Sequence, residues 1–337
     1  MNHLGGEYRH TVVALDDDTR AANGVAKDVA ISFSKCRKTR NPFGGTTQLY
    51  ALLSRAKPDL VLTYNWGSMD GVMAARACRL ALIHTEDGFG DNEAVRQKPR
   101  RVWYRRLLLP GAKAVVAPST TLARIMREVW KLPQDRIRYI PNGVDTHLFA
   151  PSAAARTNDD AVVIGTVGQL RREKRQDRMI EACATLGATR NLRLVLVGDG
   201  AEQDALKQTA RELNFENHVD FKGRTAEPQS AYRQFDIFAL SSSTEQMPLS
   251  VLEAMATGLP VLSTDVGDVK GMVSDANREF VTDWQTYLNA LDRLIIDPQL
   301  RQRLGQENRC RCLKVYNLDR MIQEYDELYR RTADRAN

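Results

Sequence analysis

The sequence predicts an α/β protein with two domains, each built on a parallel sheet covered by helices on both faces. At 337 residues the chain is long for one core. Short apolar, β-rich runs alternate with helical patterns throughout. A polar stretch, AAARTNDD, separates two such series directly after 137–151. We therefore expect domains over 1–157 and 158–311, and a helical tail over 312–337. One possibility is that this tail crosses back to the first domain.

The apolar runs give the expected strands, which are 10–15, 58–64, 80–84, 113–119, a short strand within 137–151, and then 161–168, 192–200, 218–223, 236–242 and 259–265. Ser119 is placed as the N-cap of the helix that follows it. Ligands of such sheets bind beyond the carboxyl ends of the strands. Functional residues should therefore occupy the strand-to-helix loops, and two such domains imply a cleft between them.

Composition is that of an ordinary globular protein, with 43% hydrophobic and 27% charged residues. We find no apolar run of about 20 residues and no signal peptide at the N-terminus, so we expect a cytoplasmic protein. Five scattered cysteines indicate unpaired thiols rather than disulfides or a zinc site. The net charge of +6 favours an anionic partner, but the pattern of basic and aromatic residues is not typical of nucleic-acid binding.

The stretch SSSTEQMPLSVLEAMATGLPV (241–261) is the most informative part of the sequence. Pro248 suits the first turn of a helix, which leaves the N–H groups of Leu249 and Ser250 free to bind a phosphate. Glu245 precedes this helix and Glu253 lies within it. Carboxylates accept well from vicinal hydroxyls, so the combination of acids and an anion site predicts a nucleotide sugar as ligand.

Here the sequence resembles the glycosyltransferases of family 4, which have the GT-B fold. Their motif is two glutamates separated by seven residues, and Glu245, QMPLSVL and Glu253 match it. The resemblance covers nearly the whole chain. It implies that Glu245 contacts the transferred sugar and Glu253 the ribose hydroxyls, with Met247, Leu249 and Ser250 also at the donor. The alternative is a pair of surface glutamates near a helix start.

GTVGQLRREKRQDRMIEA (165–182) looks like the first loop of the family's nucleotide domain. Gly168 lets the backbone approach the ligand. The resemblance implies that Lys174 neutralises the departing diphosphate. The alternative is that this basic loop is only the solvent-exposed segment that leads into the next helix.

This loop departs from the family pattern at two positions. Gln169 stands where the family has arginine, and Arg175 stands where it has glycine. One phosphate-binding charge is therefore missing from its expected place. Either Arg171 or Arg172 supplies it, or the donor contacts are weaker.

Two further glycine turns match the family. Gly198 and Gly200 follow the strand in LRLVLVGDG, and Gly223 with Arg224 ends the strand in HVDFKGR, where the family backbone meets the base. The chain has no complete GxGxxG, so it carries no dinucleotide fingerprint.

In the first domain, His84 ends the strand 80–84 and should point into the cleft. The resemblance implies that it contacts the donor sugar or the leaving phosphate, with Asn65 and Asp87 on the acceptor side. The alternative is that His84, as a lone histidine, has a structural role.

The resemblance also implies transfer of a hexose-type sugar with retention of anomeric configuration, without metal or cofactor, to a glycan or lipid-linked acceptor in cell-envelope glycan or polysaccharide synthesis. The departing phosphate oxygen would serve as the base. The basic and aromatic stretch 96–113 either lies on an anionic membrane or forms a partly buried helix with a cationic outer face.

Three rival hypotheses stay open. Asp16, Asp17 and Asp18 could be the metal-binding motif of the other large glycosyltransferase fold. An epimerase or hydrolase of the same architecture would act on the nucleotide sugar alone. An inactive partner subunit is the third, because the family's opening strand and glycine-rich loop have no counterpart before NHLGGEYRHTVVAL, so the first domain should lack that strand.

Overall fold

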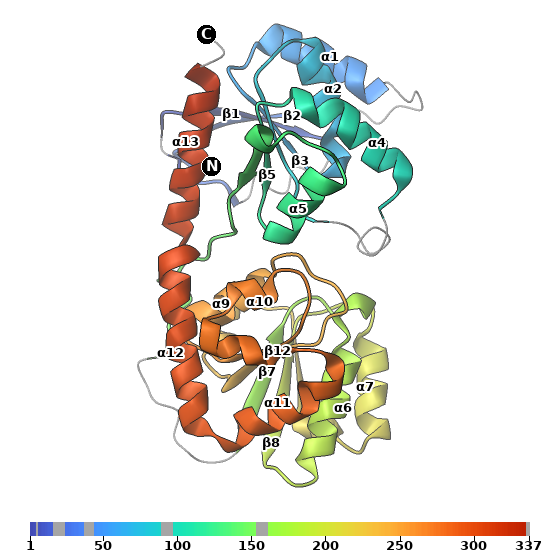
Figure 1. The fold of residues 1–337 in the computed structure, drawn as a ribbon, viewed down its shortest axis with the longest axis vertical. Coiled ribbons are helices and arrows are strands. Elements are labelled where there is room, and N and C mark those ends of the chain that lie inside the picture. Colours follow the sequence, from blue (N-terminus) through green and yellow to red (C-terminus); the bar gives the residue numbers. More distant parts are fainter. Residues whose placement is uncertain (5, 16–23, 37–43, 89–96, 153–160, 335–337) are drawn as a thin grey trace. The chain divides into compact units, whose positions relative to one another are not determined.

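The computed structural model describes residues 1–4, 6–15, 24–36, 44–88, 97–152 and 161–334. The chain forms two compact units, Met1–Pro141 with Met321–Asn337, and Asn142–Arg320 (Figure 1). The domain boundary that we placed at 157/158 falls outside the described residues, and the one at 311/312 falls inside helix α12 (Pro298–Val315).

The second unit is a doubly wound domain. Its described residues form a six-stranded parallel sheet of order β9-β8-β7-β10-β11-β12. The strands are β7 (Val162–Val167), β8 (Leu192–Val197), β9 (Val219–Gly223), β10 (Ile237–Leu240), β11 (Val261–Thr264) and β12 (Val281–Thr282). Numbered within the unit, this is the Rossmann order 3-2-1-4-5-6, whose switch point lies between β7 and β10.

Helices cover both faces of this sheet because its strands are apolar on both sides. Along β8, Leu194 and Leu196 belong to one core cluster, and Val195 and Val197 to the other. The first face carries α6 (Gln176–Gly187), α7 (Gln203–Glu212) and α11 (Trp284–Ile296), and the second carries α8 (Pro228–Tyr232), α9 (Leu249–Ala256), α10 (Val269–Met272) and α12.

The first unit holds two parallel sheets in its described residues. One has the order β3-β4-β5-β6, and β1 pairs separately with β2. The strands are β1 (Arg9–Ala14), β2 (Ala30–Lys35), β3 (Val61–Tyr64), β4 (Leu82–Thr85), β5 (Ala114–Ala117) and β6 (Ile137–Tyr139).

The larger sheet of the first unit is also covered on both faces. One face carries α1 (Gly44–Ala56), α2 (Met69–Ala77), α4 (Pro99–Leu108) and α5 (Thr120–Glu128). The other is covered by α13 (Leu318–Asp334), whose Tyr325 and Tyr329 pack against Ile83 and Ile140. Short 3₁₀ turns complete the chain at Trp66–Ser68, Leu109–Gly111, Gln134–Arg136, Arg172–Lys174, Glu216–His218 and Asp275–Phe280.

The strands expected from sequence are confirmed, and the structure adds β2 and β12. The β2 sequence, AISFSK, alternates apolar and polar residues over a short stretch that we did not single out, and β12 has only two residues. Ser119 caps α5 as expected, with its Oγ accepting from the N–H of Leu122 at 3.0 Å. Pro248 lies one position earlier than expected, as the extended N-cap residue of α9.

The loops after β7 and β8 fit together through glycines. Gly168 donates to Val197 O at 2.9 Å, and Leu170 donates to Asp199 O at 2.8 Å. A Cβ on Gly198 would overlap the carbonyl oxygen of Gly168, and the φ of Gly198 is +140°. Gly198 is therefore needed so that one loop can support the other.

We predict that Gly198→Ala lowers the free energy of unfolding by about 3 kcal/mol or more, because it combines a left-handed backbone with a main-chain clash. Gly271→Ala is the matched control, since nothing lies within 4 Å of the Cβ that it would add. Urea unfolding of both variants measures the difference. Equal stability of the two would contradict this account of the loops.

Candidate functional site

The serine run at the end of β10 joins the turn that follows β7. Ser241 Oγ donates to the carbonyls of Lys174 and Arg175 at 3.1 and 2.8 Å. Ser243 N donates to Glu173 O at 2.8 Å. These bonds cross the switch point of the sheet, where ligands of doubly wound domains bind. We did not single out these serines from sequence, because their partners lie about 70 residues away.

Lys174 and Glu245 form an ion pair at this point, with 2.6 Å between Nζ and Oε1. Ser242 Oγ donates to the same oxygen at 2.7 Å. The Lys174 side chain is 27% exposed and that of Glu245 is 9% exposed. The structure therefore brings together the two residues to which the resemblance gives the diphosphate and the sugar.

The loop after β11 supports the main chain of Glu245. Asp268 N donates to Gln246 O at 2.9 Å. Gly267 has φ +56°, and a Cβ there would lie 2.6 Å from Glu245 O. Only glycine lets this loop approach so closely.

Glu253 lies in the second turn of α9, and its Oε2 accepts from the hydroxyl of Tyr232 at 2.6 Å. Burial raises the pKa of the Glu253 carboxyl, and the hydrogen bond from Tyr232 opposes that rise. Leu249 is exposed and Ser250 partly exposed at the start of the helix, where the first N–H groups have no intrahelical partner. Met247, in contrast, is buried, and its Sδ accepts from Asn142 N at 3.4 Å.

The glycines expected at the nucleotide lie at adjoining loops. Gly198 donates to Gly223 O at 2.8 Å, which places the β9 end beside the β8 turn. Gly200 would meet Leu170 O if it carried a Cβ, so it supports the first loop as Gly198 does. Gln169 and Arg224 are exposed at these loops.

Arg175 has the left-handed conformation, with φ 50° and ψ 40°, which explains why glycine suits this position. Its guanidinium donates to both carboxylate oxygens of Asp177, from Nε at 3.0 and 3.1 Å and from Nη2 at 2.8 Å. This pairing raises the pKa of Arg175 and holds the side chain against its own helix. Arg175 is thus engaged within its own loop and helix.

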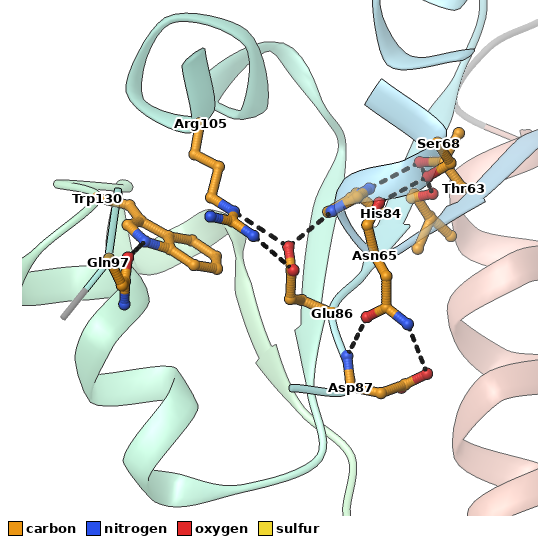
Figure 2. Close-up of polar contacts among 10 residues, drawn as sticks. Thr63, Asn65, Ser68, His84, Glu86, Asp87, Gln97, Arg105 and Trp130 are labelled. Carbon is orange, nitrogen blue, oxygen red and sulfur yellow. Dashed lines mark hydrogen bonds and ion pairs between the residues drawn. The ribbon is translucent and has the colours of Figure 1, made fainter. Parts of the chain in front are cut away.

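In the first unit, His84 lies in the interior of the fold. The ring is fully buried, with Nδ1 2.9 Å from Thr63 Oγ1 and Nε2 3.3 Å from Glu86 Oε2 (Figure 2). The strand β4 is buried along its whole length, so a side chain at its end meets protein rather than solvent. In this structure His84 is a structural partner of Glu86, with both ring nitrogens engaged.

Glu86 also pairs with Arg105, an interaction that sequence inspection missed. Arg105 Nη2 lies 2.7 Å from Oε1, and both side chains are 1% exposed. The guanidinium lies 5.2 and 4.6 Å from the ring centroids of Trp66 and Trp130. The sequence shows Arg105 only as one residue of a basic stretch, because nothing local marks one arginine of such a stretch as buried.

Asn65 and Asp87, expected on the acceptor side, contact each other at the ends of β3 and β4 (Figure 2). Asp87 N donates to Asn65 Oδ1 at 2.7 Å. Asn65 has φ 56° and ψ 177°, a strained conformation of the kind that clusters at functional sites. Burial raises the pKa of the Asp87 carboxyl.

Within the described ranges, no three His, Cys, Asp or Glu side chains are grouped as metal ligands would be. Asp16, Asp17 and Asp18 lie outside these ranges. Likewise, no helix in the described part of the chain has the length and apolar character needed to span a membrane.

We predict strong coupling between Glu86 and Arg105. Arg105→Met alone should cost about 3–5 kcal/mol, because it leaves a buried carboxylate without its cation. The double variant Arg105→Met/Glu86→Gln should be more stable than the sum of the single changes implies, by about 1 kcal/mol or more. A double-mutant cycle by urea unfolding tests this, and additive effects would show that the pair is not coupled.

Several curated proteins are similar to this chain. Putative glycosyltransferase EpsF of Bacillus subtilis is 31% identical, over 48% of this chain and 44% of its own length. A D-inositol 3-phosphate glycosyltransferase of Stackebrandtia nassauensis is 30% identical, over 69% and 58%. The chain thus spans about half the length of these two. An Escherichia coli UDP-Gal:alpha-D-GlcNAc-diphosphoundecaprenol alpha-1,3-galactosyltransferase is 26% identical, over 83% and 77%.

Solved structures share the fold. Anabaena HepE in complex with UDP superposes with a TM-score of 0.75 at 20% identity, over 89% of this chain and 86% of that one. A glycosyltransferase from Rickettsia africae gives a TM-score of 0.77 at 16% identity, over 96% and 97%. Both likenesses support the GT-B fold.

Two family models together account for most of the sequence. Residues 2–148 match the model described as Glycosyltransferase Family 4. Residues 152–311 match the one described as Glycosyl transferases group 1. With the Glu245–Glu253 motif at the switch point of a Rossmann-ordered sheet, these matches show that the chain belongs to the family 4-type glycosyltransferases of the GT-B fold.

Proposed function

We propose that this chain transfers a hexose-type sugar from a nucleoside-diphosphate sugar to a hydroxyl acceptor, with retention and without a metal ion. The observation that carries the proposal is the Lys174–Glu245 ion pair at the switch point, beside the start of α9. HepE was solved with UDP and with UDP-glucose, which supports a UDP-sugar as the first donor to test.

The charges at this point suit the leaving group. Lys174 forms an ion pair with Glu245. A bound diphosphate would provide a second anion for Lys174 and for the first N–H groups of α9, where charge develops as the sugar departs. Glu245 Oε2 would then accept from a hydroxyl of the sugar, while Ser242 retains Oε1.

In the proposed reaction, the bond between the anomeric carbon and the diphosphate oxygen breaks, and its electron pair stays on the diphosphate. The acceptor oxygen forms the new bond on the same face of the sugar. Its proton passes to the departing phosphate oxygen, so no side chain is required as the base. We assign Asn65 and Asp87 to the acceptor, on the basis of their contact and the strained backbone of Asn65.

We predict that Lys174→Ala lowers kcat about 10²-fold or more, because a preorganised charge opposite the diphosphate is lost. Lys314→Ala, at the exposed end of α12, is the control and should keep full activity. Mass analysis of products from UDP-, GDP- and ADP-sugars with glycan and lipid-linked acceptors measures the effect. Rapid turnover without acceptor would favour an epimerase or hydrolase, and loss of activity with a chelator would favour a metal enzyme.

We further propose that α4 places the enzyme on the cytoplasmic face of an anionic membrane, near a lipid-linked acceptor used in cell-envelope glycan or polysaccharide synthesis. Trp103 and Leu107, one turn apart, are 58% and 53% exposed. Arg100 and Arg106 are exposed on the same helix. An exposed apolar pair flanked by arginines suits an anionic lipid surface. The alternative is a solvated cationic face.

We predict that the full chain floats with vesicles containing anionic lipid and not with neutral vesicles. Trp103→Ser/Leu107→Ser should abolish flotation, because it removes the apolar contact. Leu313→Ser, which alters an exposed leucine in the second unit, should float as the unaltered chain does. Indifference to lipid charge would contradict the membrane proposal and leave the transfer reaction unaffected.

A further inference from the structure

Tyr232 and Glu253 form a buried contact that the family motif does not include. Tyr232 ends α8 and is 0% exposed, and its hydroxyl donates to Glu253 Oε2 at 2.6 Å. A hydrogen bond to a carboxylate at this length is charge-assisted and strong. A carboxylate has two oxygens, and this bond engages only one of them.

The tyrosine ring is held firmly, so its hydroxyl has a defined position. Its centroid lies 5.8, 5.8 and 5.9 Å from those of Phe149, Phe235 and Phe238. The next residue, Arg233, donates to the carbonyls of Ala150 and Leu148 at 3.2 and 3.1 Å. The end of α8 is therefore anchored on both its aromatic and its polar side.

The same bond acts on the charge of Glu253. Burial raises the pKa of this carboxyl, and donation from Tyr232 favours the ionised form. From α12, the guanidinium of Arg309 and the thiol of Cys312 also face α9, but they bond to the carbonyls of Ala256 and Leu252. Tyr232 is thus the side chain that contacts the Glu253 carboxylate among the described residues.

We propose that Tyr232 is a positioning residue for nucleotide binding: its hydroxyl fixes Glu253 Oε2 and leaves Oε1 to accept from the two ribose hydroxyls of the donor. The inference rests on the proposed function, in which Glu253 is the ribose ligand. A carboxylate fixed by one oxygen offers the other in a defined direction, and the acceptor-only, ionised form is the one that receives both hydroxyls.

The test is the affinity of the full chain for UDP, GDP and ADP, measured by calorimetry over a pH series from about 5 to 8. Tyr232→Phe keeps the ring and removes the hydroxyl. Tyr287→Phe is the control, because Tyr287 is equally buried in the same unit and its hydroxyl has no hydrogen-bond partner among the described residues. Titration of the nucleotide itself changes the affinity of variant and wild type equally, so the ratio of the two affinities at each pH is free of this effect.

For the nucleotide that binds wild type most tightly, we expect Tyr232→Phe to weaken binding about 10-fold at neutral pH. The loss should grow as the pH falls. Without the hydrogen bond from Tyr232, the Glu253 carboxyl of the variant protonates at a higher pH than that of wild type. Tyr287→Phe should bind as wild type does. A ratio that does not grow toward low pH, or an equal loss in both variants, overturns the positioning role. If wild type binds none of the three nucleotides, the donor proposal itself fails.

Discussion

The hydrogen bonds from the serine run to the turn after β7 are the constraint on which the donor side depends. They span the two strands at which the order of the sheet reverses, and both loops carry residues of the motif. Without them, the turn with Lys174 would be an exposed basic segment, and an exposed lysine pairs weakly with a carboxylate. With them, Lys174 meets a nearly buried Glu245.

In each of the two motif glutamates, neighbouring side chains hold one of the two carboxylate oxygens. Lys174 and Ser242 take Oε1 of Glu245, and Tyr232 takes Oε2 of Glu253. Rotation of each carboxylate is therefore restricted before any ligand arrives, which reduces the entropy lost on binding. The glycines act on the same principle at the level of the backbone, because Gly198, Gly200 and Gly267 let neighbouring loops support each other directly.

The first unit places its charges differently. Arg105 and Glu86 lie in the interior, where ionic groups are stable only when each has a partner of suitable geometry, and His84 contacts Glu86 there. Glu86 adjoins Asp87 in sequence, so these buried contacts fix the end of β4, where Asp87 meets Asn65 from the end of β3. Arg105 also fixes α4, whose opposite side carries the exposed Trp103.

The sequence by itself determined the parallel α/β architecture, nearly every strand and the donor motif, because these depend on local periodicity and on spacing within one loop and helix. It missed the bonds from Ser241 and Ser243 to the turn after β7, the contact of Tyr232 with Glu253 and the burial of Arg105. Only the tertiary structure decided these features, because each depends on partners remote in sequence, such as Trp130 for Arg105. Local pattern cannot tell whether a polar side chain meets such a partner or solvent.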